Sequence, residues 1–213
     1  MSHPIELQVG GLTPMTTIDY PGELSAVVFC QGCPWRCRYC HNSELIPRRG
    51  KTSIPWSEVI EFLRQRRGLL DAVVFSGGEP TLQRALTPAI QQVKAMGYKI
   101  GLHTGGPYPE RLKEILPYLD WVGLDIKAMK ENYAEVTGVK DSGKKAWESA
   151  KILIESGVAH EIRTTVHPAL TSSTEQQAIT DRLRQLGTDR HRLQGCILEN
   201  CLDPNLRQDH PRR

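Results

Sequence analysis

Residues 25–42 read SAVVFCQGCPWRCRYCHN and place a dense group of cysteines directly after a short apolar run. The run 25–30 is rich in valine and phenylalanine, a composition that favours a buried β-strand. The thiols of Cys33, Cys37 and Cys40 follow it, with three and then two residues between them. Because thiolates are preferred ligands of iron–sulfur centres, one short loop with this spacing can wrap a compact cluster. The segment therefore predicts a metal centre at the carboxyl end of a strand.

The number of closely spaced thiols distinguishes a structural zinc site from an iron–sulfur cluster. A structural zinc site needs four ligands, normally from two separate pairs of residues. Three thiolates can instead hold three irons of a [4Fe–4S] cluster and leave the fourth iron open, as in catalytic metal sites. Cys30 could add a fourth ligand, or it could be a small buried apolar residue at the end of the strand. We expect Cys33, Cys37 and Cys40 to be the metal ligands.

Apolar, β-branched runs recur along the chain and alternate with amphipathic stretches, as in α/β proteins. We expect strands at residues 25–30, 72–75, 99–102, 121–125, 160–166 and 192–198, and helices at residues 56–67, 85–96, 109–116, 144–156 and 175–186. Six β units with right-handed helical crossovers predict a parallel sheet that curls toward a barrel. A closed eight-unit TIM barrel takes about 250 residues, so this chain of 213 residues predicts an open, partial (β/α)6 TIM-like barrel.

Length and composition fit a single globular domain, with 39% hydrophobic and 24% charged residues. We divide it into an N-terminal extension at residues 1–22 that packs on the core, a core domain at residues 23–200 and a C-terminal tail at residues 201–213. The tail is polar from residue 205 onward, which predicts fraying. The net charge of +3 is small and scattered, so we expect no nucleic-acid partner.

The first residues, MSHP, lack the charged and apolar regions of a signal peptide, and no apolar run approaches membrane-spanning length. We therefore expect a cytoplasmic protein without a membrane partner. The cytoplasm keeps thiols reduced, so the six cysteines are better candidates for metal binding than for disulfides. Cys196 and Cys201, near the C-terminus, could bind a second metal, form a redox pair or have no special role.

Residues 76–80 read SGGEP and follow the second predicted strand. Gly77 and Gly78 would let the backbone approach a ligand more closely than residues with side chains allow, and the alternative is an ordinary turn into a helix. Glu79 could bond an ammonium group, or it could cap the following helix.

Charged residues also lie at the ends of the fourth and fifth predicted strands. Alternation places Asp125 and Lys127 on one face, where they could bind a ligand or form a salt bridge across the barrel mouth. On the fifth strand Arg163, Thr165 and His167 share a face. The fork of Arg163 suits a carboxylate ligand or an internal ion pair. His167 could bind a ligand or form hydrogen bonds within the barrel end.

The cysteine spacing, with the aromatic Tyr39 before the last cysteine, resembles the signature of the radical S-adenosylmethionine superfamily. That resemblance implies one oxygen-sensitive [4Fe–4S] cluster whose open iron chelates the amino and carboxylate groups of S-adenosylmethionine. It also implies that one-electron reduction splits this cofactor into methionine and a 5′-deoxyadenosyl radical.

Further motifs resemble those of the same superfamily. Residues 76–80 are similar to its Gly-Gly-Glu-Pro motif, whose backbone meets the methionine end of the cofactor. Asp125 and Lys127 resemble an Asp-x-Lys pair that lies beside the cofactor in activases of glycyl radical enzymes. His167 is loosely similar to a position near the cofactor's ribose or carboxylate. The resemblance implies cofactor-binding roles for a larger set: Tyr39, Gly77, Gly78, Glu79, Thr104, Asp125, Lys127, Arg163 and His167.

The third predicted strand leads into residues 102–106, LHTGG, where relatives commonly read Asp-Thr-Asn-Gly. His103 stands in place of the aspartate, which argues against a monovalent-cation site built on that residue. Thr104 and Asp125 could still contribute to such a site.

Residues 10–22 (GGLTPMTTIDYPG), 40–42 (CHN) and 75–83 (FSGGEPTLQ) together resemble one subgroup, the anaerobic ribonucleoside-triphosphate reductase activating proteins. This resemblance implies that the deoxyadenosyl radical takes a hydrogen atom from a glycine of a much larger reductase. It also implies a flavodoxin- or ferredoxin-like electron donor. The chain has no cysteine between Cys40 and Cys196, so we expect a single cluster.

Two other functions are compatible with these residues. The chain could be a radical S-adenosylmethionine enzyme that acts on a small molecule, such as a synthase of the deazaguanine pathway. It could also be a metal-binding module without catalytic activity.

Overall fold

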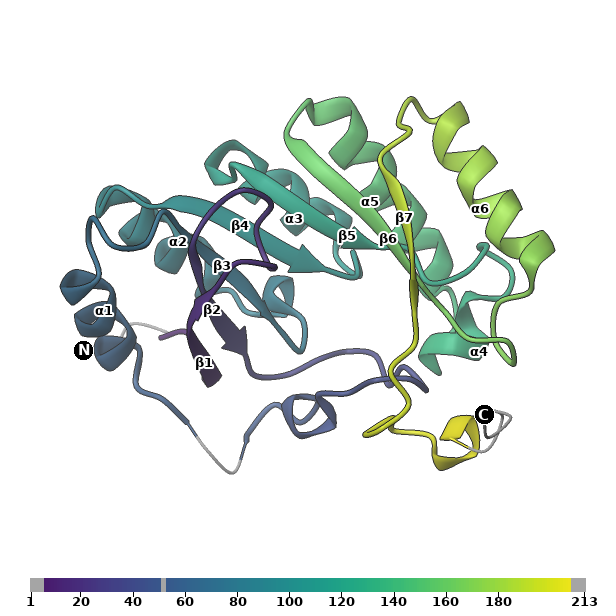
Figure 1. Ribbon diagram of the computed structural model, residues 1–213, viewed down its shortest axis with the longest axis horizontal. Coiled ribbons are helices and arrows are strands. Elements are labelled where there is room, and N and C mark those ends of the chain that lie inside the picture. Colours follow the sequence, from purple (N-terminus) through teal and green to yellow (C-terminus); the bar gives the residue numbers. More distant parts are fainter. Residues whose placement is uncertain (1–5, 51–52, 208–213) are drawn as a thin grey trace.

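The computed structural model describes residues 6–50 and 53–207. Its centre is a seven-stranded sheet in which the strands lie side by side in chain order (Figure 1). β1 is antiparallel to β2, and each later pair of neighbours is parallel. The strands are β1 (Val9–Thr16), β2 (Ser25–Cys30), β3 (Ala72–Gly77), β4 (Lys99–Thr104), β5 (Trp121–Asp125), β6 (Ala159–Val166) and β7 (His191–Gly195). The predicted α/β fold with an open (β/α)6 arrangement is confirmed for β2 to β7.

Helices follow the parallel strands and cover the outer side of the curved sheet (Figure 1). They are α1 (Trp56–Gln65), α2 (Leu86–Ala95), α3 (Pro109–Ile115), α4 (Tyr133–Thr137), α5 (Ser142–Ser156) and α6 (Ser173–Gln185), with short 3-10 turns η1 (Ser43–Leu45), η2 (Pro80–Leu82), η3 (Leu116–Tyr118) and η4 (Pro204–Arg207). The main hydrophobic core lies between these helices and the sheet. In the described ranges, no helix is both long enough and apolar enough to cross a bilayer.

α5 illustrates how the sequence produces these elements. Its buried residues Ala146, Ala150 and Leu153 recur at helical spacing, so one face of the helix packs on the core. The helix ends where Gly157 takes a φ of 74°, a left-handed conformation that costs glycine little.

β1 was not predicted as a strand. Its sequence, VGGLTPMT, holds two glycines and a proline, which disfavour isolated β-structure. Pairing with β2 stabilises it nevertheless, with irregular register between Val9 and Gly11 and between Thr13 and Thr16. The predicted extension 1–22 therefore contributes an edge strand to the sheet.

The C-terminal segment is also more ordered than expected. The Leu202 N–H donates to the carbonyl oxygen of Cys40 at 3.0 Å, and Asp203 pairs with Arg38 at 2.7 Å. Leu206 is only 1% exposed. The prediction of fraying is wrong for residues 205–207, because contacts from distant parts of the chain hold them. Residues 208–213 lie outside the described ranges.

Candidate active site

A cavity of about 470 Å³ lies at the carboxyl ends of the parallel strands, within the size range of small-molecule sites. The cysteine loop, defined here as residues 31–42, forms one wall. The turn after β3 and the ends of β4, β5, β6 and β7 form the others. All predicted site residues except His167 line this cavity: Cys33, Cys37, Tyr39, Cys40, Gly77, Gly78, Glu79, Thr104, Asp125, Lys127 and Arg163.

Backbone hydrogen bonds hold the cysteine loop from two sides. The Cys33 N–H donates to the carbonyl oxygen of Ile46 at 3.0 Å, on the η1 side. The Arg36 N–H donates to Thr137 O at 2.9 Å, on the α4 side. These bonds fix the backbone that carries the thiols, and all three cysteines line the cavity.

The three thiols fit an iron–sulfur cluster better than a single ion. In the parts of the chain that the structure describes, the Sγ atoms of Cys33, Cys37 and Cys40 do not all lie within 4.8 Å of one another, as the ligands of a single ion would. A wider separation suits a cluster, in which each thiolate binds a different iron. Burial raises the pKa of Cys33 to about 12 and that of Cys37 to about 11, so the thiolate forms require a nearby cation such as iron.

Cys30 occupies a different environment. It is fully buried at the end of β2, belongs to the hydrophobic core and does not line the cavity. The structure therefore supports the apolar alternative for Cys30 and gives no support to a fourth thiolate ligand.

Gly77, the last residue of β3, and Gly78, which follows it, are needed for close packing of the backbone. Gly77 has a φ of 110°, and a Cβ there would lie 2.5 Å from the Cys30 nitrogen. A Cβ on Gly78 would lie 2.4 Å from the carbonyl oxygen of Gly32. Cys30 ends β2 and Gly32 lies at the start of the cysteine loop, so both glycines allow close packing of the end of β3 and the following turn against that part of the chain.

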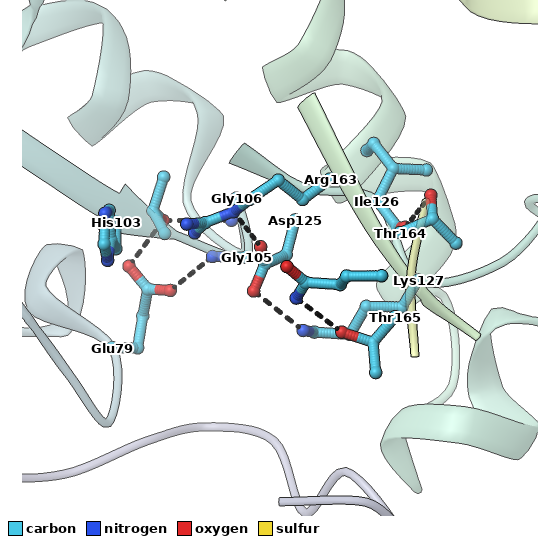
Figure 2. A network of polar contacts seen from close by, with 12 residues as sticks. Glu79, His103, Gly105, Gly106, Asp125, Ile126, Lys127, Arg163, Thr164 and Thr165 are labelled. Carbon is cyan, nitrogen blue, oxygen red and sulfur yellow. Dashed lines mark hydrogen bonds and ion pairs between the residues drawn. The ribbon is translucent and has the colours of Figure 1, made fainter. Parts of the chain in front are cut away.

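Glu79 is the centre of a buried hydrogen-bond network (Figure 2). Its carboxylate accepts hydrogen bonds from the Thr104 hydroxyl at 2.7 Å, the Gly105 N–H at 3.0 Å and the Thr81 N–H at 3.0 Å, as well as from the Thr81 hydroxyl. Burial raises the pKa of Glu79, and these hydrogen bonds oppose that effect. The bonds to Thr81 cap η2, as one of the two predicted roles of Glu79 requires, and they use only Oε1.

Asp125 lies between two cations at the ends of β5 and β6 (Figure 2). Its Oδ1 is 3.1 Å from Arg163 Nε, and its Oδ2 is 3.4 Å from Lys127 Nζ. Burial alone would raise the pKa of Asp125, but the adjacent positive charges hold it below its ordinary value. One carboxylate and two cations leave a net positive charge, which favours an anionic ligand group at this wall of the cavity.

His103, Thr104 and Asp125, the residues considered for a cation site, each have protein partners. His103 Nε2 contacts the Asp19 carbonyl oxygen at 2.9 Å, and its ring packs edge-on against Trp121. Burial, with a further contribution from Arg163, lowers the pKa of His103 to about 4, so the ring is neutral near pH 7. The Thr104 hydroxyl donates to Glu79, whereas Asp125 pairs with cations. The two remaining candidate ligands thus belong to separate networks.

His167 lies outside the cavity lining, in contrast to its predicted role. The ring is 3% exposed, its Nδ1 accepts from the Ala169 N–H at 3.1 Å, and its Nε2 donates to Leu206 O at 3.1 Å. The strand ends at Val166, so the alternation that placed His167 with Arg163 no longer applies. His167 therefore holds the C-terminal segment, as the hydrogen-bonding alternative predicts.

Several cavity residues were not singled out from the sequence, among them Trp35, Gln194 and Ile197. The Trp35 ring packs against Tyr133. It also lies beside Gly105, and a Cβ on residue 105 would come 2.4 Å from the Trp35 ring. Gln194 Nε2 donates to the Thr165 hydroxyl at 2.9 Å. The position of Trp35 inside the cysteine motif was an available signal, whereas nothing local marked Gln194 or Ile197.

The model of the radical SAM superfamily matches residues 27–181. The chain belongs to this superfamily. Radical SAM proteins use a [4Fe–4S] cluster together with S-adenosylmethionine, and the cavity fits both. It offers three soft sulfur ligands for a cluster and a net positive wall for a carboxylate.

Two relatives place this radical SAM chain in the glycyl-radical activase family. It is 31% identical over 185 residues, 83% of this chain and 75% of the relative, to a Methanocaldococcus jannaschii protein named for glycyl-radical enzyme activation. It is 33% identical over 175 residues, 79% of this chain and 72% of the relative, to the pyruvate formate-lyase-activating enzyme of Clostridium pasteurianum.

A solved structure supports the fold of this radical SAM domain. SuiB of Streptococcus suis, bound to S-adenosylmethionine, superposes with a TM-score of 0.64 at 18% identity. The match covers 78% of this chain and 39% of SuiB, so the present chain corresponds to less than half of that larger protein.

Proposed function

We propose that this chain installs the radical of an anaerobic ribonucleoside-triphosphate reductase, a large glycyl radical enzyme. The observation that carries the proposal is the single cavity in which three thiols, the turn after β3 and the Asp125 ion-pair network face one another. The reductase is favoured as the partner by the sequence of residues 10–22, which resembles the activating proteins of that enzyme. A flavodoxin- or ferredoxin-like protein is the proposed electron donor.

In this proposal Cys33, Cys37 and Cys40 hold the [4Fe–4S] cluster. When bound there, the cluster would supply one-electron reduction of S-adenosylmethionine, the chemistry that provides a 5′-deoxyadenosyl radical for hydrogen abstraction from glycine. The fixed backbone of the cysteine loop supports this role, because the ligands need little reorganisation on loading. Among the described residues, Cys33, Cys37 and Cys40 are the cysteines that line the cavity, so a bound cluster would keep one position for S-adenosylmethionine.

The polar walls have distinct proposed roles toward the methionine part of S-adenosylmethionine. Lys127 and Arg163 share the single carboxylate of Asp125, so their excess positive charge can attract the methionine carboxylate. Glu79 faces the cavity from the opposite wall, and its Oε1 accepts most of its hydrogen bonds. Its Oε2 accepts only from Gly105 among the described residues, which leaves capacity for an ammonium donor.

The open side of the cavity suits a macromolecular substrate. β7 is an edge strand, and the segment after it brings Ile197, which is 63% exposed, to the cavity lining. The exposed His41 lines the same side. A loop of a partner protein can therefore approach the cavity between the cysteine loop and the end of β7.

The direct test uses anaerobically reconstituted protein with dithionite, S-adenosylmethionine and the full-length candidate reductase. We expect a glycyl-radical doublet in the electron paramagnetic resonance spectrum and cleavage of the reductase backbone after exposure to oxygen. A reductase in which the radical-bearing glycine is replaced by alanine is the control. Formation of 5′-deoxyadenosine without a protein radical would reject this partner and favour a small-molecule substrate.

A pair of cysteine variants tests the ligand assignment. Cys37→Ala should lose most of the iron and the ability to form 5′-deoxyadenosine, because its thiol lines the cavity. Cys30→Ala is the matched control, and it should retain both because Cys30 lies in the core. Full cleavage activity in Cys37→Ala would overturn the assignment.

A further inference from the structure

His41, Cys196 and Cys201 converge at the edge of the cavity, beside the cysteine loop. Their potential ligand atoms all lie within 4.8 Å of one another, and the two Sγ atoms are 3.8 Å apart. His41 follows Cys40 directly, Cys196 follows the last residue of β7, and Cys201 lies in the segment that leads to η4. Two parts of the chain that are distant in sequence therefore contribute to one group.

These three side chains converge on one backbone carbonyl oxygen. The carbonyl oxygen of Ile197 is 2.5 Å from His41 Nε2, 3.2 Å from Cys201 Sγ and 3.6 Å from Cys196 Sγ. The two thiols also contact each other, so the imidazole nitrogen, both sulfur atoms and the carbonyl oxygen form one compact group of potential metal ligands. The arrangement therefore places three metal-binding side-chain atoms next to one another and next to the Ile197 carbonyl oxygen.

We propose that His41, Cys196 and Cys201 bind a single thiophilic divalent cation of the Zn²⁺ class, separate from the cluster in the cysteine loop. Two thiolates and a neutral imidazole balance the charge of a divalent ion, and the two thiol protons are released when it binds. A Cys₂His set is a known zinc combination, and the fourth position can be taken by the Ile197 carbonyl or by water. Sulfur ligands disfavour Mg²⁺ and Ca²⁺.

The surroundings already hold the ligands close to one another. Cys196 N–H donates to Val166 O at 3.0 Å, and Arg207 donates to the Cys201 carbonyl oxygen at 2.8 Å. Across the group, Leu202 N–H donates to Cys40 O at 3.0 Å. The ion would link the C-terminal segment to the exit of the cysteine loop, as Figure 1 shows these segments side by side, and so fix Ile197 at the cavity edge.

A disulfide between Cys196 and Cys201 is the main alternative. It would require loss of two electrons and two protons to an oxidant, and the Sγ atoms would have to approach from 3.8 Å to about 2.05 Å. A disulfide gives no role to His41, whose Nε2 is directed at the same carbonyl oxygen as both thiols. The geometry of all three residues therefore favours the ion.

The test uses the full-length, cluster-loaded protein, incubated anaerobically with Zn²⁺ alone and passed over a chelating resin. We expect a single equivalent of zinc in the parent protein and none in the double variant Cys196→Ser/Cys201→Ser, with unchanged iron. Cys30→Ala is the cysteine control and should keep the zinc. Equal zinc in the double variant and the parent, or no zinc in the parent, would overturn the proposal.

Cobalt provides a second readout that does not depend on the double variant folding. Co²⁺ bound by two thiolates should give a sulfur-to-cobalt charge-transfer band, and His41→Ala should shift its visible ligand-field bands. After zinc is removed without oxidant, the protein is treated with an alkylating reagent and analysed by mass spectrometry. Both Cys196 and Cys201 should be alkylated, which shows that they were free thiols. A Cys196–Cys201 disulfide in that preparation would favour the redox pair and reject the ion site.

Discussion

Replacing Gly77 by alanine should destabilise the protein more than replacing Gly97. Both glycines have positive φ angles, 110° and 96°, so each alanine carries a backbone cost of about 1–2 kcal/mol. A Cβ at position 77 would also lie 2.5 Å and 2.7 Å from the backbone nitrogen and oxygen of Cys30, whereas nothing lies within 4 Å of a Cβ at position 97. Backbone atoms of a central strand cannot rotate away, so overpacking adds about 1–3 kcal/mol.

We therefore expect losses in unfolding free energy of about 1–2 kcal/mol for Gly97→Ala and about 2–5 kcal/mol for Gly77→Ala. Urea unfolding of the cluster-free protein, followed by circular dichroism under anaerobic reducing conditions, measures both values. Iron content after reconstitution should fall for Gly77→Ala alone, because Cys30 directly precedes the cysteine loop. Equal destabilisation by the two substitutions would refute the reasoning from close packing.

Three further predictions concern the ion-pair network, a neutral histidine and the C-terminal segment. Asp125→Asn should cost about 3 kcal/mol in urea unfolding because it leaves two cations unpaired, and adding Arg163→Gln should recover part of the loss. Burial lowers the pKa of His103 to about 4, so the unfolded chain takes up a proton at a higher pH than the folded chain does. The free energy of unfolding should therefore fall as the pH drops from about 6.5 to 4. His103→Gln should flatten that part of the profile, and an unchanged slope would count against a buried neutral ring. Leu206→Ala should speed amide exchange at Leu202 by lowering the local opening free energy by about 2 kcal/mol, without affecting amides of the central strands.

Much of the fold could be read from local sequence patterns. Short apolar runs fixed the bounds of β2 and β5 correctly, because parallel strands buried on both sides are continuously apolar. β1 and α4 were missed for different reasons. β1 depends on pairing with β2 despite its glycines and proline, and α4 is a five-residue helix whose buried Tyr133 packs on Trp35 of the cysteine loop. The local sequence does not predict β1, because its composition disfavours a strand, and it does not predict α4, because the helix is too short to show a periodic pattern.

Site residues that lie at or directly after the carboxyl end of a strand could be predicted from the sequence. Cys33 follows β2, and Gly77 and Asp125 are the last residues of β3 and β5. Because these strands are parallel in one sheet, the topology alone brings the three residues to the same edge. The partners of Glu79 and the position of His167 could not be predicted, since they depend on contacts with β4 and with the C-terminal segment. Similarly, the association of His41 with the late cysteines becomes visible only when the chain is folded.

The most direct test of the proposed radical chemistry follows one hydrogen atom. The candidate reductase is produced with deuterium on the α-carbon of glycine and mixed with the reconstituted protein, S-adenosylmethionine and a reductant without oxygen. If this chain activates that reductase, mass spectrometry will find deuterium in the 5′-deoxyadenosine in step with growth of the glycyl-radical signal. Unlabelled 5′-deoxyadenosine, or none from protein with a complete cluster, would contradict the account.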